Sequence, residues 1–174
     1  MKAVAFTGMP GAGKTEAINV AREMNIKVIS MGDEVREEVI ERGLSLSDEI
    51  TGRIADEMRK KYGADYWAKR CLAKLSNEDF FVIDGIRNME EVEKFREKIG
   101  ELILVAIHAS PPTRYERIRK RKRYGNDMSI EKFKEREKKE LSWGLGNVIA
   151  MADIVIINEG SLEEFKEKVR KILS

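Results

Sequence analysis

One segment constrains this chain more than any other, and it reads Gly8-Met9-Pro10-Gly11-Ala12-Gly13-Lys14-Thr15-Glu16. From Gly8 to Thr15 it matches the phosphate-binding pattern G-x-x-x-x-G-K-[ST] at every fixed position. The apolar run before it, Ala3 to Thr7, predicts a buried strand, and the residues from Glu16 to Met24 predict a helix. A glycine-rich turn between a strand and a helix directs backbone N–H groups and the positive end of the helix dipole at one anion. We therefore expect this segment to bind a nucleoside triphosphate, with Lys14 on the terminal phosphates and the Thr15 hydroxyl on Mg²⁺.

The composition favours one globular domain in the cytoplasm. The 174 residues are 42% hydrophobic, which is enough for one well-packed core. Although 37% of the residues are charged, the net charge is only +2, so the overall charge does not indicate binding to nucleic acid or to a membrane surface. The sequence shows no signal peptide and no apolar run of membrane-spanning length. Cys71 is the single cysteine, and we interpret it as a small core residue.

Five apolar runs predict the strands of a sheet: Ala3–Thr7, Lys27–Ser30, Phe80–Asp84, Glu101–His108 and Asp153–Asn158. Most are uninterrupted and rich in Val and Ile, as expected for strands that are buried on both faces of a parallel sheet. Charged segments with helical periodicity lie between the strands, and three serines are placed to cap helices, at Ser47, Ser129 and Ser161. This alternation predicts a doubly wound α/β fold, whose ligands bind at the carboxyl ends of the strands.

Two long helical insertions interrupt the alternation. The first spans about residues 32–76, between the second and third strands, and the second spans about residues 112–151, between the fourth and fifth. In a small phosphate-binding α/β protein, insertions at these places position a second substrate and a closing lid. We therefore treat residues 1–174 as a single domain with an acceptor-binding insertion and an arginine-rich lid.

A carboxylate ends the third strand, in the sequence Phe80-Phe81-Val82-Ile83-Asp84-Gly85. An acid at the carboxyl end of a strand can face the glycine-rich loop and hold Mg²⁺, usually through water. An aspartate at such a position can instead be a turn former. Because the phosphate-binding pattern is present, we favour the metal role and assign Mg²⁺ to Thr15 and Asp84.

Three further polar residues are expected at the same edge of the sheet. Arg87 follows Asp84 in the loop after the third strand, and Asp33 and Arg36 follow the second strand at the start of a helix. An arginine there can bind a phosphate through two hydrogen bonds, and an aspartate can orient an attacking oxygen or accept its proton. Asp33 is equally consistent with an acid that the helix dipole favours, and Arg36 with a solvated helix face. We assign substrate binding to Asp33, Arg36, Asp84 and Arg87, and a catalytic role to Asp33 as well.

Basic residues crowd one predicted helix and the segment after it, namely Arg114, Arg117, Arg119, Lys120, Arg121, Lys122 and Arg123. Arg136 follows on the next predicted helix. Arginines on a lid can neutralise the charge of a transferring phosphoryl group. We therefore assign catalytic roles to Lys14, Arg117, Arg121 and Arg136. A solvated basic face or an RNA-contacting surface is the competing interpretation.

Several motifs resemble those of known kinases. Besides the glycine-rich loop, two motifs resemble the adenylate-kinase-like nucleoside monophosphate kinases: Ile29-Ser30-x-Gly32-Asp33-x-x-Arg36 and Asp84-Gly85-x-Arg87. Three segments are similar to dephospho-coenzyme A kinase: Ser110-Pro111-x-x-Arg114-Tyr115-x-Arg117, Ser129-x-Glu131-x-Phe133-x-x-Arg136-Glu137 and Ala152-Asp153-x-x-Ile156-x-Asn158. The whole chain is most similar to a group of archaeal adenylate-kinase-related proteins.

This resemblance implies a three-layer P-loop kinase fold with a five-stranded parallel sheet, and it implies ATP and Mg²⁺ as cofactors. It also implies that Arg36 and Arg87 bind the phosphate of the acceptor. The loop from Asn158 to Ser161 would then border the adenine of ATP.

The chain departs from both families. Adenylate kinases carry proline where Ile86 precedes Arg87, and dephospho-coenzyme A kinases do not normally present the Asp84-Gly85-x-Arg87 motif. The acceptor therefore stays open between a nucleotide phosphate held by Arg36 and Arg87 and a sugar hydroxyl activated by Asp33.

Taken together, the residues predict an enzyme that transfers a phosphoryl group from Mg·ATP to a small nucleotide-like acceptor. The alternative is a nucleotide-dependent ATPase or switch, which could be RNA-associated. The chain has no Asn-Lys-x-Asp motif for reading guanine, which argues against a GTPase switch. Neither the oligomeric state nor the preference for ATP over GTP follows from these residues.

Overall fold

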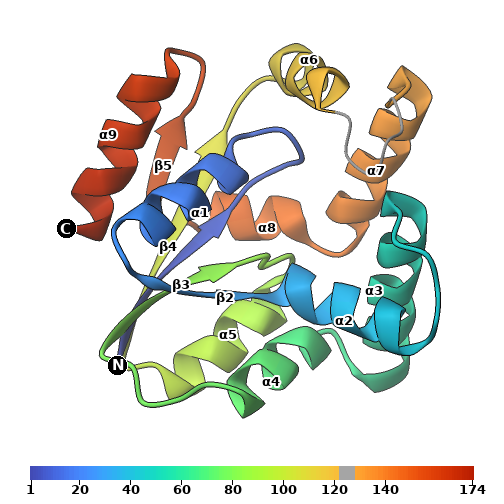
Figure 1. Cartoon of the computed structure of the whole chain (residues 1–174), viewed down its shortest axis with the longest axis horizontal. Helices are drawn as coiled ribbons and strands as arrows, with labels where there is room; N and C mark the ends of the chain where they lie inside the picture. Colours follow the sequence, from blue (N-terminus) through green and yellow to red (C-terminus); the bar gives the residue numbers. More distant parts are fainter. Residues whose placement is uncertain (122–127) are drawn as a thin grey trace.

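The structure, a computed structural model, describes residues 1–121 and 128–174. These residues form one five-stranded parallel sheet with helices on both faces (Figure 1). The strands are β1 (Lys2–Thr7), β2 (Lys27–Ser30), β3 (Phe80–Asp84), β4 (Glu101–His108) and β5 (Ile154–Ile157). Their order across the sheet is β2-β3-β1-β4-β5. Each of the five apolar runs therefore forms a strand, within one residue of the predicted bounds.

The helices complete a three-layer α/β fold, as predicted. They are α1 (Lys14–Glu23), α2 (Met31–Glu41), α3 (Asp48–Tyr62), α4 (Tyr66–Ala73), α5 (Met89–Lys98), α6 (Pro111–Lys120), α7 (Ile130–Ser142), α8 (Leu145–Ala150) and α9 (Leu162–Leu173). Helices α1 and α9 cover one face of the sheet, and α2 to α5 with α8 cover the other. Helices α6 and α7 lie beyond the carboxyl ends of the strands (Figure 1).

Both faces of the sheet are buried, which explains the uninterrupted apolar runs. Along β1, Val4 and Phe6 pack towards α1 and α9, whereas Ala3 and Ala5 pack towards α2 to α5. All four side chains are fully buried. Because alternate residues of a strand point to opposite faces, a strand between two helical layers has no solvent-facing side.

The local predictions of helix starts are confirmed at all three serines. Ser47 Oγ accepts a hydrogen bond from Ile50 N at 3.1 Å. Ser129 and Ser161 accept in the same way from the amide three residues further on, each at 3.2 Å. These bonds satisfy N–H groups that the first turn of a helix leaves without partners. Cys71 is buried in the core, also as expected.

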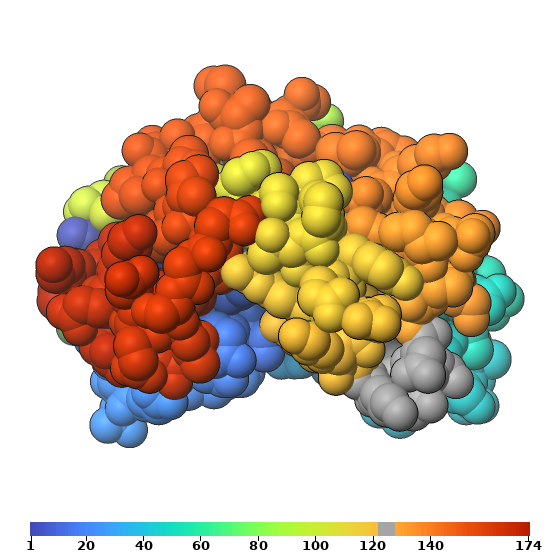
Figure 2. All heavy atoms as spheres, turned by 90° about the horizontal axis from the view of Figure 1, so that it is seen from above, coloured from blue at the N-terminus to red at the C-terminus, as the bar shows by residue number. Residues whose placement is uncertain are grey.

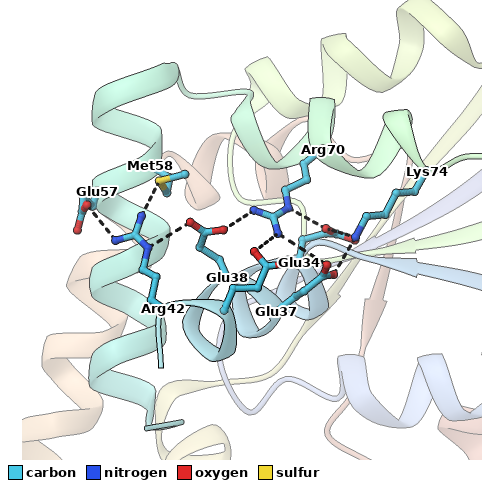
Figure 3. Close-up of polar contacts among 9 residues, drawn as sticks. Glu34, Glu37, Glu38, Arg42, Glu57, Met58, Arg70 and Lys74 are labelled. Atoms are coloured by element: carbon cyan, nitrogen blue, oxygen red, sulfur yellow. Dashed lines mark hydrogen bonds and ion pairs between the residues drawn. The ribbon is translucent and has the colours of Figure 1, made fainter. Parts of the chain in front are cut away.

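The first insertion consists of α2, α3 and α4, which ion pairs hold together (Figure 3). Arg70 on α4 contacts Glu34 at 3.0 Å and Glu38 at 2.8 Å, both on α2. At the end of α2, Arg42 contacts Glu57 on α3 at 3.2 Å. These pairs fix α2 relative to its two neighbours.

The second insertion, predicted as the lid, consists of α6, α7 and α8 in the part that the structure describes. Helix α8 buries Leu145 and Val148 and contacts β1 and β4, so it belongs to the core layer. Lys122 and Arg123 of the predicted basic cluster lie outside the described residues. None of the helices in the described ranges has the length and apolar character that a bilayer-spanning helix requires.

The register of the sheet brings the predicted polar residues to one edge. Asp84 is the register partner of Phe6 on β1 and of Ser30 on β2. The carboxyl ends of β1, β2 and β3 therefore lie side by side, and the glycine-rich loop continues from the end of β1. This edge is where an open α/β sheet binds its ligands.

Candidate active site

The loop from Gly8 to Thr15 packs so closely against its neighbours that it requires glycine, most clearly at Gly11 and Gly13. These two residues have φ angles of +81° and +123°. A Cβ atom at Gly13 would lie 2.4 Å from Asn158 Nδ2, and one at Gly11 would lie 2.6 Å from the carbonyl oxygen of Arg114. The loop can therefore pack this closely against its neighbours only with glycine. This geometry fits a phosphate cradle, which we call the P-loop.

Two arginines of α6 hold the carbonyl groups of the P-loop. Arg114 is buried, and its Nη1 donates to Pro10 O at 3.1 Å. Nη1 of Arg117 donates to the carbonyl oxygens of Gly11 and Ala12, each at 3.2 Å. Figure 2 shows α6, in yellow, between the C-terminal segment in red and α7 in orange. The first helix of the predicted lid thus supports the P-loop in this structure.

Asn158 supports the same loop from the end of β5. The side-chain Nδ2 of Asn158 donates to Ala12 O at 2.8 Å, and the backbone carbonyl oxygen of Asn158 accepts from Nη2 of Arg117 at 2.6 Å. The side chain is buried against Gly13. Asn158 therefore lies at the edge of the P-loop.

Lys14 lies within the loop and points back at its start. Nζ of Lys14 donates to the Gly8 carbonyl oxygen at 2.6 Å. Burial, together with the nearby positive charge of Arg87, lowers the pKa of Lys14 to about 7, while Glu140 and Asp84 oppose the shift. A triphosphate at the P-loop would favour the ammonium form, because an opposite charge raises the pKa of a lysine.

The chemistry of the donor set fits Mg²⁺ bound through few protein ligands. Thr15 and Asp84 line the same small cavity, and Asp84 Oδ2 accepts a hydrogen bond from Ser30 Oγ at 3.3 Å. Among the described residues there is no group of three or more His, Cys, Asp or Glu that could hold a metal alone. Mg²⁺ commonly binds one or two protein oxygens and completes its shell with phosphate oxygens and water. Thr15 and Asp84 suit that mode.

Two adjoining cavities lie at this edge of the sheet. The smaller, of about 130 Å³, is lined by Lys14, Thr15 and Asp84. The larger, of about 530 Å³, lies between α2, α3 and α7, and its apolar wall includes Val35 and Trp143. Its volume is within the range of small-molecule sites. Seven residues line both cavities and form what we call the shared rim: Gly32, Arg36, Asp48, Gly85, Arg87, Met128 and Arg136.

Each arginine of the shared rim contacts a carboxylate. Nε of Arg87 lies 2.6 Å from Oε2 of Glu140, whose side chain is only 8% exposed. Nη1 of Arg136 lies 3.6 Å from Asp48, and Arg36 pairs with Asp33 one helical turn away. The rim arginines are therefore held in orientation by carboxylates.

The structure brings most of the predicted catalytic and substrate-binding residues together but places two of them elsewhere. Arg36, Asp84, Arg87, Arg121 and Arg136 line the smaller cavity with the P-loop. The Asp33 side chain is 60% exposed and lines neither cavity. Arg117 also lines neither, because it is bound to the P-loop carbonyl groups.

Several residues of the site were not predicted, among them Asp48, Glu140 and Trp143. Asp48 on the shared rim directly follows Ser47, which was predicted only as a helix cap. Glu140 and Trp143 lie near the end of α7, and no local pattern distinguishes them from other residues of a charged helix.

Comparisons with known structures agree with this fold. The shikimate kinase from Aquifex aeolicus vf5 superposes with a TM-score of 0.56 at 19% identity, covering 98% of this chain and 95% of that chain. A gluconokinase from Sinorhizobium meliloti 1021 superposes with a TM-score of 0.59 at 17% identity, covering 97% and 89%. Fold and P-loop together therefore define an α/β protein of the P-loop kinase fold.

Sequence comparisons identify the family. A family model described as an AAA domain matches residues 7–134, more than half of the chain. A UPF0200 protein from Hyperthermus butylicus is 44% identical over 98% of this chain and 92% of its own length. A UPF0200/UPF0201 protein from Archaeoglobus fulgidus is 47% identical over 99% of this chain, which spans only 55% of that relative. The chain belongs to the AAA domain family and to the UPF0200 proteins.

Proposed function

We propose that this protein transfers a phosphoryl group from Mg·ATP to a small nucleotide-like acceptor, of the nucleoside monophosphate or dephospho-coenzyme A type. The observation that carries the proposal is the shared rim. A donor cavity at the P-loop opens onto a separate cavity of acceptor size, and Arg36, Arg87 and Arg136 lie between them. An ATPase needs only water at this point, whereas a transferase needs a second binding site in line with the first.

The P-loop and its neighbours would hold the donor. Backbone N–H groups of the loop and the Lys14 ammonium bind the terminal phosphates. Thr15 and Asp84 hold Mg²⁺, which supplies charge neutralisation for the transferred group. The kinases of known structure with this fold support phosphoryl transfer as the class of reaction.

The rim arginines would hold and neutralise the reacting groups. Arg36 and Arg87 bind the phosphate of the acceptor, and Arg136 with Arg121 closes on the transferring group. Asp33 was the predicted base for a hydroxyl acceptor. Its exposure favours the other option, an acceptor that presents a phosphate. Asp48 is the carboxylate on the rim, and it orients Arg136.

The test is an ADP-release screen of nucleoside monophosphates, dephospho-coenzyme A and related nucleotides with Mg·ATP and Mg·GTP. We expect one acceptor to stimulate ADP release and to appear as a phosphorylated product by mass spectrometry. ADP release that no acceptor stimulates would support the ATPase alternative instead. In that case, RNA association is tested by the salt dependence of binding, which falls steeply for phosphate contacts.

A further inference from the structure

Two unsatisfied polar atoms belong to the wall of the larger cavity. Among the residues that the structure describes, Arg59 Nη1 and Glu140 Oε2 are the buried side-chain atoms without a hydrogen-bond partner. Arg59 and Glu140 are 9% and 6% exposed, and both line this cavity. Glu140 Oε2 lies 2.6 Å from Nε of Arg87 as an ion pair, and a carboxylate oxygen in such a pair can still accept a further hydrogen bond. Buried polar atoms without partners are rare, because leaving them unpaired costs free energy.

A chain of buried contacts joins the two atoms. Arg59 donates from Nη2 and Nε to Oε1 of Glu91, at 2.8 and 3.2 Å. Oε2 of the fully buried Glu91 accepts from the backbone N–H of Arg87 at 2.7 Å, and Arg87 in turn pairs with Glu140. The chain therefore ends in an unpaired donor at Arg59 Nη1 and, at Glu140 Oε2, in a carboxylate oxygen that can accept one hydrogen bond beyond its ion pair with Arg87. Its two arginines and two glutamates balance in charge, so a neutral group suits the space between the ends.

An aromatic side chain lies beside these two ends. The guanidinium carbon of Arg59 is 4.6 Å from the ring centroid of Trp143. Nε1 of Trp143 donates to Oδ1 of Asp56 at 2.9 Å, which fixes the orientation of the indole. Trp143 is partly exposed and lines the larger cavity. Aromatic side chains held in this way bind flat rings by stacking or edge contacts.

We infer that this corner of the larger cavity binds a flat neutral group that presents a hydrogen-bond acceptor beside a donor, as the edge of a nucleobase does. The acceptor atom of the base faces Arg59 Nη1, and its N–H faces Glu140 Oε2. The inference rests on the proposed function, since it places the base here and the phosphate of the same molecule at the shared rim. Both atoms are covered in this structure, so the ligand reaches them when the Arg59 and Glu140 side chains turn towards the cavity.

The test compares ligands with and without a base. The affinities of AMP, GMP, CMP and UMP are measured by calorimetry on protein saturated with Mg·ADP, and ribose 5-phosphate supplies the same sugar and phosphate alone. We expect at least one nucleotide to bind about 10- to 100-fold more tightly than ribose 5-phosphate. Equal affinity for all five ligands, or no binding of any nucleotide, overturns the base subsite. Failure of Mg·ADP itself to bind would remove the proposed function and this inference together, so the two failures are distinguishable.

Two variants assign the gain to the named atoms. Arg59→Met removes the donor and Glu140→Met removes the acceptor, and each should lower the preference for the nucleotide over ribose 5-phosphate about tenfold. The preference is the ratio of the affinity for the nucleotide to the affinity for ribose 5-phosphate. A change in phosphate binding affects both affinities and therefore cancels in this ratio. Arg96→Met and Glu131→Met make the same substitutions at exposed positions outside both cavities and should leave the ratio unchanged. Because Arg59→Met leaves the Glu91 carboxylate buried without its partner, Glu140→Met decides the outcome if Arg59→Met does not fold. An unchanged ratio in Glu140→Met contradicts the assignment.

Discussion

The two halves of the candidate site are built in different ways. The donor half is a run of consecutive residues, Gly8 to Thr15, whose backbone forms the cradle. The acceptor half gathers side chains from α2, α3 and α7, and ion pairs such as Arg59–Glu91 and Arg87–Glu140 hold them in place. Main-chain donors stay the same when side chains change, whereas a cavity lined by paired side chains changes its chemistry with each substitution. We therefore expect the donor half to resemble that of other P-loop proteins and the acceptor half to set specificity.

The largest expected effect tests the donor half. Lys14→Ala removes the ammonium beside the triphosphate, and acceptor-stimulated ADP release should fall on the order of 10³-fold or more. Lys168→Ala, at an exposed position on α9, is the matched control and should keep the wild-type rate. A coupled assay for ADP measures both variants. Turnover close to wild type in Lys14→Ala would rule out the mechanism.

A second prediction is that an arginine of the acceptor half and an arginine of the donor half affect different kinetic constants. Arg136 lies on the shared rim, so Arg136→Met should lower kcat about 100-fold with little change in Mg·ATP affinity. Arg117 holds P-loop carbonyl groups, so Arg117→Met should weaken Mg·ATP binding about tenfold. Arg119→Met, an exposed change on the same helix as Arg117, is the control. Steady-state kinetics and calorimetry distinguish the two patterns, and a reversed result would exchange the roles of the two arginines.

A smaller effect concerns the proton on Lys14. Burial lowers the pKa of Lys14 to about 7, and a bound triphosphate raises it again, so above pH 7 binding must be accompanied by proton uptake. The affinity for Mg·ATP should therefore fall as the pH rises above 7, by at most about tenfold per pH unit. Calorimetry at pH 8.5 in buffers of different ionisation enthalpy should show uptake of a fraction of a proton up to about one. The same titration at pH 6 is the control, because Lys14 is already protonated there. No uptake at pH 8.5 would mean that the pocket does not depress this pKa.

The same contrast explains how much could be predicted from sequence. The P-loop is predictable because its function lies in consecutive backbone groups, and the spacing of Gly8, Gly13 and Lys14 reports them directly. Asp84 was predictable because parallel strands end at one edge of a sheet, so an acid at a strand end must lie near that edge. The five strands were predictable for a similar reason, since burial on both faces requires apolar residues throughout.

The acceptor half could be predicted only in part. Gly32, Val35 and Arg36 share the face of α2 that borders the larger cavity, and Asp33 is displaced from Gly32 by about 100° around the helix. The sequence of α2 did not indicate which face would turn inward. Glu140 and Trp143 reach the cavity because α7 lies across from α3, where Lys139 packs against Gly52, and such packing has no local signature. Residues that act through tertiary contacts were therefore the ones missed.

The smallest expected effect tests whether side-chain pairing outside the cavities also supports the acceptor half. Arg70 is 17% exposed and contacts Glu34 and Glu38, whose side chains are 11% and 16% exposed. Arg70→Met removes one of the two cations that contact each of these partly buried carboxylates, since Lys74 still contacts Glu34 and Arg42 still contacts Glu38, so the free energy of unfolding should fall by about 2 kcal/mol. Lys27→Met breaks the exposed pair with Glu78 and should cost less than about 1 kcal/mol. Urea denaturation measures both losses.

None of these residues lines either of the two cavities, so Mg·ATP affinity should stay unchanged in both variants. Any loss of ligand affinity in Arg70→Met should appear in acceptor binding, through movement of α2. Equal losses of Mg·ATP and acceptor affinity would mean that the two halves do not depend on separate supports.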